Sequence, residues 1–270
     1  MELPVTVMGE GESLLLIHGG ISEASFFYGV MDRLKDRYRL IAYDRRGYGK
    51  AEAPADGDYT VQSQMEDAVR ILTRHADCPA WVLGNSAGAM VAAELAILHP
   101  DLVRGLILME PSLGMDEESD RKLREWNKKL NEFVKAGRIK KALPAFYDAF
   151  GPDDSVPDIR PEGTSLAEIK QTYRNLTTFM RGELNEVEGH RPSEEALRAL
   201  PMPVCVMVSE LGEHRLFGHT SKLGAEHMGW PLYRVPGNHN AFQFHPDESA
   251  EIIHSVISEM KNAEKKRCQV

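Results

Sequence analysis

The chain has 270 residues, of which 42% are hydrophobic and 27% are charged, a balance typical of a compact protein that buries a large core. From this length we expect one domain with room for an insertion. The formal net charge of -9 disfavours nucleic acid and anionic membrane surfaces as partners, and a small molecule is the simplest partner to expect.

Neither a leader nor a metal-binding pattern stands out. The first residues contain no basic stretch followed by an apolar one, and the apolar run Leu14 to Ile17 is too short for a secretory signal or a membrane span. We therefore expect a cytoplasmic protein. The three cysteines have no repeated spacing, so they indicate neither a disulfide framework nor a zinc site. The oligomeric state stays open.

Short apolar runs of about strand length recur along the chain. The first five are Leu14 to Ile17, Leu40 to Tyr43, Ala80 to Leu83, Gly105 to Met109 and Val204 to Val208. A sixth expected strand is Leu232 to Val235. Because the first five runs are continuous rather than alternating, they predict parallel strands whose two faces are both covered by helices.

Helical patterns separate these runs. The two in the first half are Val61 to His75 and Ala87 to His99, and another, Asp247 to Met260, lies near the end. This alternation predicts an α/β fold with a doubly wound, mostly parallel sheet. Ligands of such sheets bind beyond the carboxyl ends of the strands, so the residues that follow each run are the candidates for chemistry.

The character of the sequence changes after the fourth run. Charged amphipathic helices are expected over Glu118 to Lys135 and Ser165 to Met180, and the proline-rich stretch Gly151 to Gly163 is expected to be a loop. We interpret residues 112–200 as a helical cap inserted between two strands. The sheet itself is then formed by residues 1–111 and 201–270.

One motif points directly to nucleophilic catalysis. The sequence Gly84-Asn85-Ser86-Ala87-Gly88 matches G-x-S-x-G, and it lies between an expected strand and an expected helix. The glycines permit a tight turn that exposes the serine oxygen. The amino end of the helix directs free N–H groups toward a developing oxyanion, so the Ala87 N–H is the expected first donor.

Three further motifs make the sequence resemble the α/β-hydrolase family over roughly residues 3–111 and 201–260. They are His18-Gly19-Gly20, Asp44-Arg45-Arg46-Gly47-Tyr48-Gly49 and Gly237-Asn238-His239. The resemblance implies that the first is the oxyanion loop, with the Gly20 N–H as second donor, and that the third is the histidine loop. His18 and the Asp44 turn are expected to be structural.

His239 is the expected general base among ten histidines. It follows an expected strand and the turn Pro236-Gly237 late in the chain, as the order serine, acid, histidine requires. A helix start explains His245 better. The remaining candidates of the late polar segment are expected on the surface: His214, His219 and His227.

The acid that should orient the histidine is less clear. The commonest family pattern places an aspartate near Gly212, which Glu210 and Glu213 flank. Another acid, Glu110, sits at the end of an apolar run before proline. Haloalkane dehalogenases and zearalenone lactonases carry their acid at this strand, and the segment Gly237 to Pro246 also resembles the lactonase histidine loop. We favour Glu110, and the two other glutamates stay open.

Serine at the turn implies acyl transfer through an acyl-enzyme, whereas dehalogenases need aspartate there. We expect hydrolysis of an ester or lactone, with neither metal nor organic cofactor. Carbon–carbon bond hydrolysis by the same residues is one alternative, and a ligand receptor with little turnover is another.

The expected cap supplies aromatic residues that could contact a substrate. They also fit the cap's own core, but together they favour a small, moderately apolar molecule. The candidate contacts are Trp126, Phe133, Phe146, Tyr147 and Tyr173, with Phe150 and Met180 beside them.

Overall fold

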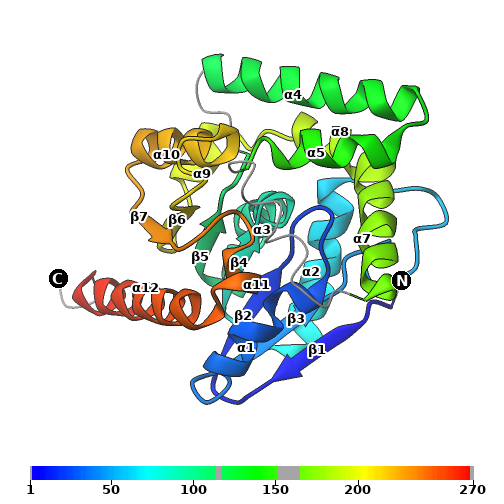
Figure 1. The fold of residues 1–270 in the computed structure, drawn as a ribbon. Helices are drawn as coiled ribbons and strands as arrows, with labels where there is room; N and C mark the ends of the chain where they lie inside the picture. Colours follow the sequence, from blue (N-terminus) through cyan, green and yellow to red (C-terminus); the bar gives the residue numbers. More distant parts are fainter. Residues whose placement is uncertain (1, 113–116, 151–164, 268–270) are drawn as a thin grey trace.

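The computed structural model describes residues 2–112, 117–150 and 165–267 and contains a seven-stranded sheet (Figure 1). The strands lie in the order β1-β3-β2-β4-β5-β6-β7. Only β1 runs antiparallel to its neighbour. The bounds are β1 (Val5–Met8), β2 (Glu12–Ile17), β3 (Tyr38–Tyr43), β4 (Ala80–Asn85), β5 (Val103–Met109), β6 (Val204–Ser209) and β7 (Leu232–Val235). The predicted α/β sheet is confirmed.

The continuous apolar runs arise because helices cover both faces of the sheet. In β2, Leu14 and Leu16 pack into one buried cluster and Leu15 and Ile17 into the other, since successive side chains point to opposite faces. Helices α1 (Tyr28–Leu34), α11 (Ala241–Phe244) and α12 (Pro246–Arg267) pack on the first side. Helices α2 (Val61–His75) and α3 (Ala87–Leu98) pack on the second.

The sequence patterns missed β1. Its residues Val5–Met8 are all only half buried, and polar Thr6 interrupts the apolar residues. The strand pairs antiparallel with β3, from Val5 opposite Tyr43 to Met8 opposite Leu40. An edge strand with neighbours on one side needs no long apolar run, and so it left no clear signal.

All regular elements that the structure describes between β5 and β6 are helical. This part of the chain contains α4 (Glu117–Lys135), α5 (Ala142–Tyr147), α7 (Leu166–Thr178), α8 (Leu184–Gly189) and α9 (Glu194–Arg198), here called the inserted helices. A π-helical turn, Phe179–Glu183, joins α7 to α8 where one helix through Met180 was expected. The loop expected at Gly151 to Gly163 lies outside the described residues.

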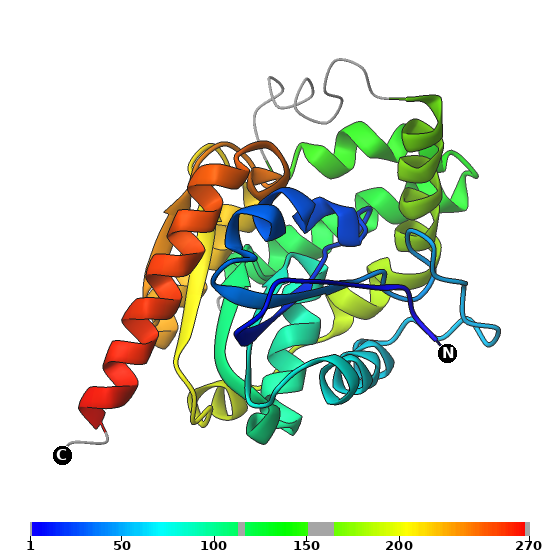
Figure 2. The same ribbon diagram turned by 90° about the horizontal axis from the view of Figure 1, so that it is seen from below.

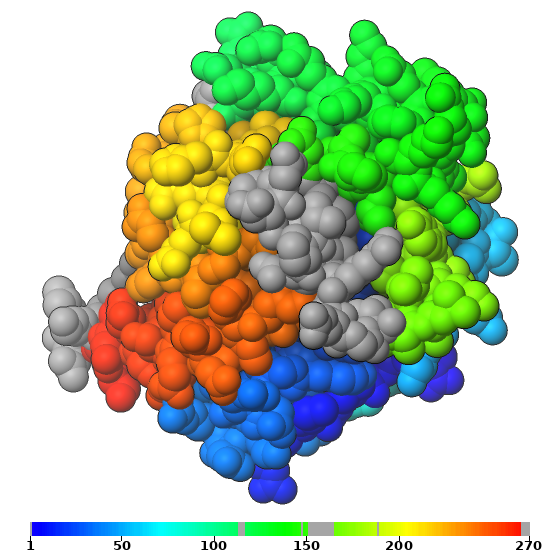
Figure 3. Space-filling model, viewed as in Figure 1, coloured from blue at the N-terminus to red at the C-terminus, as the bar shows by residue number. Residues whose placement is uncertain are grey.

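Helices α4, α5, α7 and α8 lie together beyond one edge of the sheet (Figure 1), whereas α9 lies apart from them and contacts α3. The space-filling view shows a green mass that adjoins the yellow segment (Figure 3). Helix α10 (Leu216–Met228) packs on β6 and meets α4. Short 3-10 turns complete the described elements: Ala24–Phe27, Pro100–Leu102 and Ile139–Lys141.

Helix α12 runs along one flank of the sheet (Figure 2). Its buried residues Ile253, Val256 and Ile257 belong to the same cluster as Leu14 of β2, while its other residues include many charges. Within the described ranges, no helix combines the length and the apolar character that crossing a bilayer requires.

Candidate active site

Ser86 occupies a strained turn between β4 and α3. Its backbone has φ 54° and ψ -121°, a region that side chains rarely adopt. Its N–H donates to the Met109 carbonyl at 2.8 Å, which ties the turn to the end of β5. A Cβ at Gly84 would lie 2.4 Å from the Gly88 carbonyl oxygen, and one at Gly88 would lie 2.3 Å from the Ile17 carbonyl oxygen. Both glycines are therefore required by the close approach of backbone.

The two residues expected to donate to an oxyanion, Ala87 and Gly20, lie on the two segments next to Ser86. Ala87 is the first residue of α3, and the N–H groups of a first helical turn have no acceptor within the helix. The loop after β2 passes directly against the serine, because a Cβ on Gly19 would lie 3.0 Å from the Ser86 Cβ. Gly20 is the next residue of that loop, and the ring of Phe179 covers its Cα.

His18 holds this loop from within the protein. The ring is fully buried. Its Nδ1 donates to the Gly19 carbonyl at 2.8 Å, while its Nε2 accepts from the Arg45 backbone N–H at 3.0 Å. Burial, and then the Arg45 charge, hold the pKa of His18 well below its usual value. A neutral ring with these two partners fits the structural role that the sequence suggested.

The structure brings Glu110 and His239 together. The carboxylate is completely buried, and its Oε2 accepts a hydrogen bond from His239 Nδ1. Its Oε1 accepts from the Ser209 N–H at 2.8 Å and from the Ser209 hydroxyl at 2.5 Å. Ser209 ends β6, between the strands that carry the acid and the histidine. Sequence reasoning gave this serine no role, because no motif marks it.

The two alternative acids are placed differently. Glu213 accepts hydrogen bonds from Arg234 at 2.7 and 2.8 Å and from Lys222 at 3.0 Å. These contacts lower the pKa of Glu213 to about 2. Glu210 is exposed and directly follows Ser209, the last residue of β6. Of the three glutamates, Glu110 is the one that the structure bonds to His239.

Gly212 explains why the acid is not at its more common place. A Cβ there would lie 2.3 Å from the Ser209 hydroxyl oxygen, 2.8 Å from the Phe150 carbonyl oxygen and 3.0 Å from Glu110 Oε1. The Glu110 carboxylate and its serine partner thus fill the space that a side chain at position 212 would need.

Aromatic rings connect His239 to the loop that carries Gly20. Phe150 stacks on His239 with ring centroids 4.0 Å apart. Phe146 contacts Phe150 at 5.0 Å and Phe179 at 5.3 Å. Since Phe179 covers Gly20, three rings from the chain between β5 and β6 reach from one side of the site to the other. Sequence reasoning named Met180 as a candidate substrate contact but missed its neighbour Phe179.

The other predicted substrate contacts lie farther into the inserted helices. Trp126 is buried, its ring meets Phe146 at 5.7 Å, and its Nε1 donates to the Ala145 carbonyl. Phe133 and Tyr173 are partly buried against the same cluster. The side chain of Tyr147 lies outside the described structure. Substrate contact by any of these residues stays a prediction.

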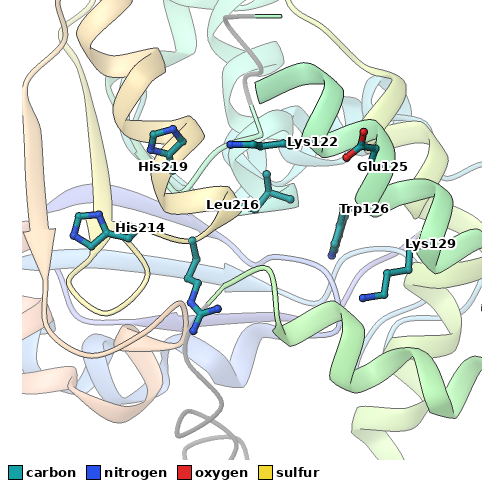
Figure 4. Close-up of a pocket in the computed structure, with 8 residues that line it drawn as sticks. Lys122, Glu125, Trp126, Lys129, His214, Leu216 and His219 are labelled. Carbon is teal, nitrogen blue, oxygen red and sulfur yellow. The ribbon is translucent and has the colours of Figure 1, made fainter. Parts of the chain in front are cut away.

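A cavity of about 380 Å³ lies between α4 and the start of α10 (Figure 4). Lys122 of α4 points across it toward α10, and Trp126 lines it from the α4 side. The remaining labelled residues include Lys129, His214, Leu216 and His219. Two histidines expected on the surface therefore line a hollow. Among the described residues, no cluster of three or more histidine, cysteine, aspartate and glutamate side chains could hold a metal ion.

Similarity to known proteins agrees with this architecture. A family model described as the alpha/beta hydrolase fold matches residues 12–156, which are more than half of the chain. The chain belongs to this α/β-hydrolase family. The match includes the turn at Ser86 and the strand that leads to Glu110.

Three curated relatives of this α/β hydrolase carry the names of hydrolases. An uncharacterized hydrolase, YraK, from Bacillus subtilis (strain 168) is 25% identical over 94% of this chain and 92% of its own. The 2-hydroxymuconate semialdehyde hydrolase of Pseudomonas sp. (strain CF600) is 29% identical over 74% and 70%. The pimeloyl-[acyl-carrier protein] methyl ester esterase of Aeromonas hydrophila is 28% identical over 62% and 66%.

Among solved structures, the enzyme MGS-M2 from a deep-sea metagenome library superimposes with a TM-score of 0.77. The alignment covers 95% of this chain and 94% of that one at 15% identity. At this identity the likeness concerns the fold, which is that of an α/β hydrolase. The family match over residues 12–156 and the relatives named as hydrolases make the chain a hydrolase by family.

Proposed function

We propose that this hydrolase cleaves an ester or lactone of a small, moderately apolar molecule through an acyl-enzyme on Ser86. The observation that carries the proposal is the buried hydrogen bond between His239 Nδ1 and Glu110 Oε2. It lies beside a strained serine turn, which is tied to the residue before Glu110. Together these groups supply a nucleophile, an acid and a base, which follow one another along the chain in the order serine, acid, histidine.

The tautomer of the histidine follows from its partner. A carboxylate only accepts, so the Nδ1 atom of His239 carries the proton and Nε2 is left with a free lone pair. In the proposed reaction, Nε2 takes the proton of the Ser86 hydroxyl as its oxygen attacks the substrate carbonyl. The same nitrogen then gives the proton to the leaving alcohol oxygen. A water molecule, deprotonated in the same way, hydrolyses the acyl-enzyme.

The developing oxyanion needs donors that are already in place. We assign this role to the N–H groups of Ala87 and Gly20. Ala87 begins a helix whose positive end faces the reacting centre. Gly20 belongs to a loop packed against the serine and held from behind by His18.

The three phenylalanines around the site support an apolar substrate portion. Phe146, Phe150 and Phe179 form one connected group between His239 and Gly20. We propose that residues 112–200 act as a cap and that these rings pack against the acyl or alcohol group. The methyl ester esterase among the relatives also supports ester cleavage.

Carbon–carbon bond hydrolysis is the second candidate. It would use the same serine, histidine and acid, and one relative is named for the hydrolysis of 2-hydroxymuconate semialdehyde. The geometry around Ser86 suits attack of the serine oxygen on a carbonyl carbon in either reaction. Ester cleavage is preferred because an alkoxide is a better leaving group than a carbanion, so the substrate needs no further activation.

Turnover of p-nitrophenyl acetate, a short lactone panel and 2-hydroxymuconate semialdehyde separates these possibilities. Rapid hydrolysis of esters or lactones that disappears in Ser86→Ala supports the proposal. The matched control is Ser25→Ala, because Ser25 is an exposed serine outside the site. Preferred cleavage of the semialdehyde would favour the alternative, and stoichiometric binding without turnover would indicate a receptor.

A further inference from the structure

A single buried guanidinium links the inserted helices to the oxyanion loop. Arg45 follows β3 and is 1% exposed. Its two terminal nitrogens donate to the Glu183 carboxylate, and Nη2 also donates to the Gly19 carbonyl at 2.9 Å. Glu183, from the π-helical turn, is completely buried. Three segments that are distant in sequence thus meet at one cation.

The surroundings of Glu183 are built for a charged carboxylate. Besides the Arg45 fork, it accepts hydrogen bonds from the Tyr48 hydroxyl and from Gln64 Nε2, the latter at 3.0 Å. Burying an ion pair has a large desolvation cost, and apolar residues of similar size often stabilise a fold equally well or better. Stability alone therefore does not explain the presence of the Arg45–Glu183 pair. The additional hydrogen bond from Arg45 to the Gly19 carbonyl suggests a second role for it.

The hydrogen bond from Arg45 to the Gly19 carbonyl fixes the direction of the Gly20 N–H group. The Gly19 carbonyl accepts from Arg45 on one side and from His18 Nδ1 at 2.8 Å. In a trans peptide the carbonyl and the following N–H point in opposite directions. Holding the Gly19 oxygen toward Arg45 therefore holds the Gly20 N–H away from Arg45, on the opposite side of the peptide.

The π-helical turn acts on the same loop a second time. Phe179 begins this turn and Glu183 ends it. A Cβ on Gly20 would lie 2.4 Å from the Phe179 ring, so the ring rests directly on the loop whose carbonyl Arg45 holds. Such turns often mark functional positions in helices. The π-helical turn thus contacts Gly20 directly through Phe179. It contacts Gly19 indirectly, because Glu183 binds Arg45 and Arg45 binds the Gly19 carbonyl.

We propose that Arg45 and Glu183 are positioning residues that aim the Gly20 N–H at the oxyanion, so that docking of the inserted helices sets the oxyanion hole. The inference rests on the proposed serine hydrolase function. Neither side chain touches the substrate in this account. Their effect is confined to stabilisation of the tetrahedral intermediate.

The test compares Glu183→Gln with Asp67→Asn. Glu183→Gln keeps the shape but removes the charge that holds Arg45. Asp67 forms the neighbouring buried pair with Arg46, at 2.7 Å, and also accepts a hydrogen bond from Arg70. The other partners of Arg46 are the carbonyls of Asp58 and Ser63 and the Asp58 carboxylate. Asp67→Asn therefore breaks a comparable pair that the structure does not connect to Gly19. Both variants are assayed with p-nitrophenyl acetate and with a trifluoromethyl ketone, which forms an oxyanion on the serine.

For Glu183→Gln we expect kcat to fall by about 10- to 100-fold, less than the 10²- to 10³-fold loss of a whole donor, with KM little changed. Affinity for the trifluoromethyl ketone should fall by the same factor. Asp67→Asn should lower the melting temperature and leave kcat and inhibitor affinity unchanged. Equal losses of kcat in the two variants, or an inhibitor affinity that Glu183→Gln leaves intact, would overturn the inference.

A milder variant covers the case in which Glu183→Gln does not fold. Tyr48→Phe removes one hydrogen bond to Glu183 and keeps the ion pair, so a smaller fall in kcat with a matching loss of inhibitor affinity is expected. Unchanged values would contradict the inference. The proposed function fails separately, if wild-type turnover does not depend on Ser86.

Discussion

Glu110 Oε2 accepts a hydrogen bond from His239 Nδ1 across a strand that lies between them in the sheet. That strand, β6, takes part through Ser209, whose N–H and hydroxyl both bind the other carboxylate oxygen. Both oxygens of the buried acid are therefore engaged, and the carboxylate has little freedom to turn. Rigid support of this kind keeps the imidazole in one orientation.

Glu110→Gln tests the acid assignment. The amide can donate to Nδ1 and so favour the wrong tautomer, and kcat should fall by several orders of magnitude, on the scale of about 10⁴-fold for such changes. Steady-state kinetics with p-nitrophenyl acetate provide the measurement. The matched control, Glu213→Gln, removes an acid that binds Arg234 and Lys222 and should keep normal kcat. The reverse pattern would move the role to Glu213.

Phe150→Leu tests whether the stacked ring holds His239, the proposed general base. Loss of the 4.0 Å stack allows the His239 ring to tilt, and kcat should fall by up to about 100-fold, the cost of a misplacement near 1 Å. Phe27→Leu, a change in a buried ring of the other core cluster, is the control and should leave kcat unchanged. Equal kcat values for the two variants would argue against this role of Phe150.

Gly20→Ala tests the contact between the loop that carries Gly20 and the π-helical turn. The added methyl group would lie 2.4 Å from Phe179 Cδ2, so the free energy of unfolding should fall by about 1–3 kcal/mol, as in overpacked cores. Phe179→Leu in the same chain should recover part of this loss. Urea unfolding of both single variants and the double variant measures the coupling. Simple additivity would mean that the two residues do not press on each other.

The pH dependence of stability tests the state of His18. Burial and the Arg45 charge lower its pKa in the folded protein, whereas an unfolded histidine has a pKa of about 6.5. As pH falls below that value the unfolded state binds a proton that the folded state does not. His18 should therefore lower the free energy of unfolding by up to about 1.4 kcal/mol per pH unit, until pH reaches its folded-state pKa.

Urea unfolding between pH 5 and 7.5 should show a shallower slope in His18→Gln than in the wild type. Nitrogen NMR of the wild type should show a proton on Nδ1 and none on Nε2 at neutral pH. Titration of the folded ring near pH 6.5 would contradict the lowered pKa.

The sheet could be predicted because its signal is local. Strands buried on both faces read as continuous apolar runs, and the serine turn needs glycines on both sides within five residues. Strand β1 escaped because it is short, half buried and pairs on one side only. The π-helical turn escaped because its pattern continues that of the preceding helix.

The rest of the site depends on contacts between distant residues. The sequence could narrow the acid to three glutamates, and the space around Gly212 shows why Glu110 takes the position. Ser209 and Glu183 carry no motif, because their importance lies in partners about 100 or more positions away, Glu110 and Arg45. Only the folded arrangement shows that these pairs exist.

The most direct test of the central proposal is covalent labelling with a fluorophosphonate, followed by peptide mass spectrometry. We predict one phosphonyl group per chain, on the peptide that contains Ser86, and a labelling rate that collapses in His239→Ala. Label on another residue, or equal labelling of Ser86→Ala, would contradict the account.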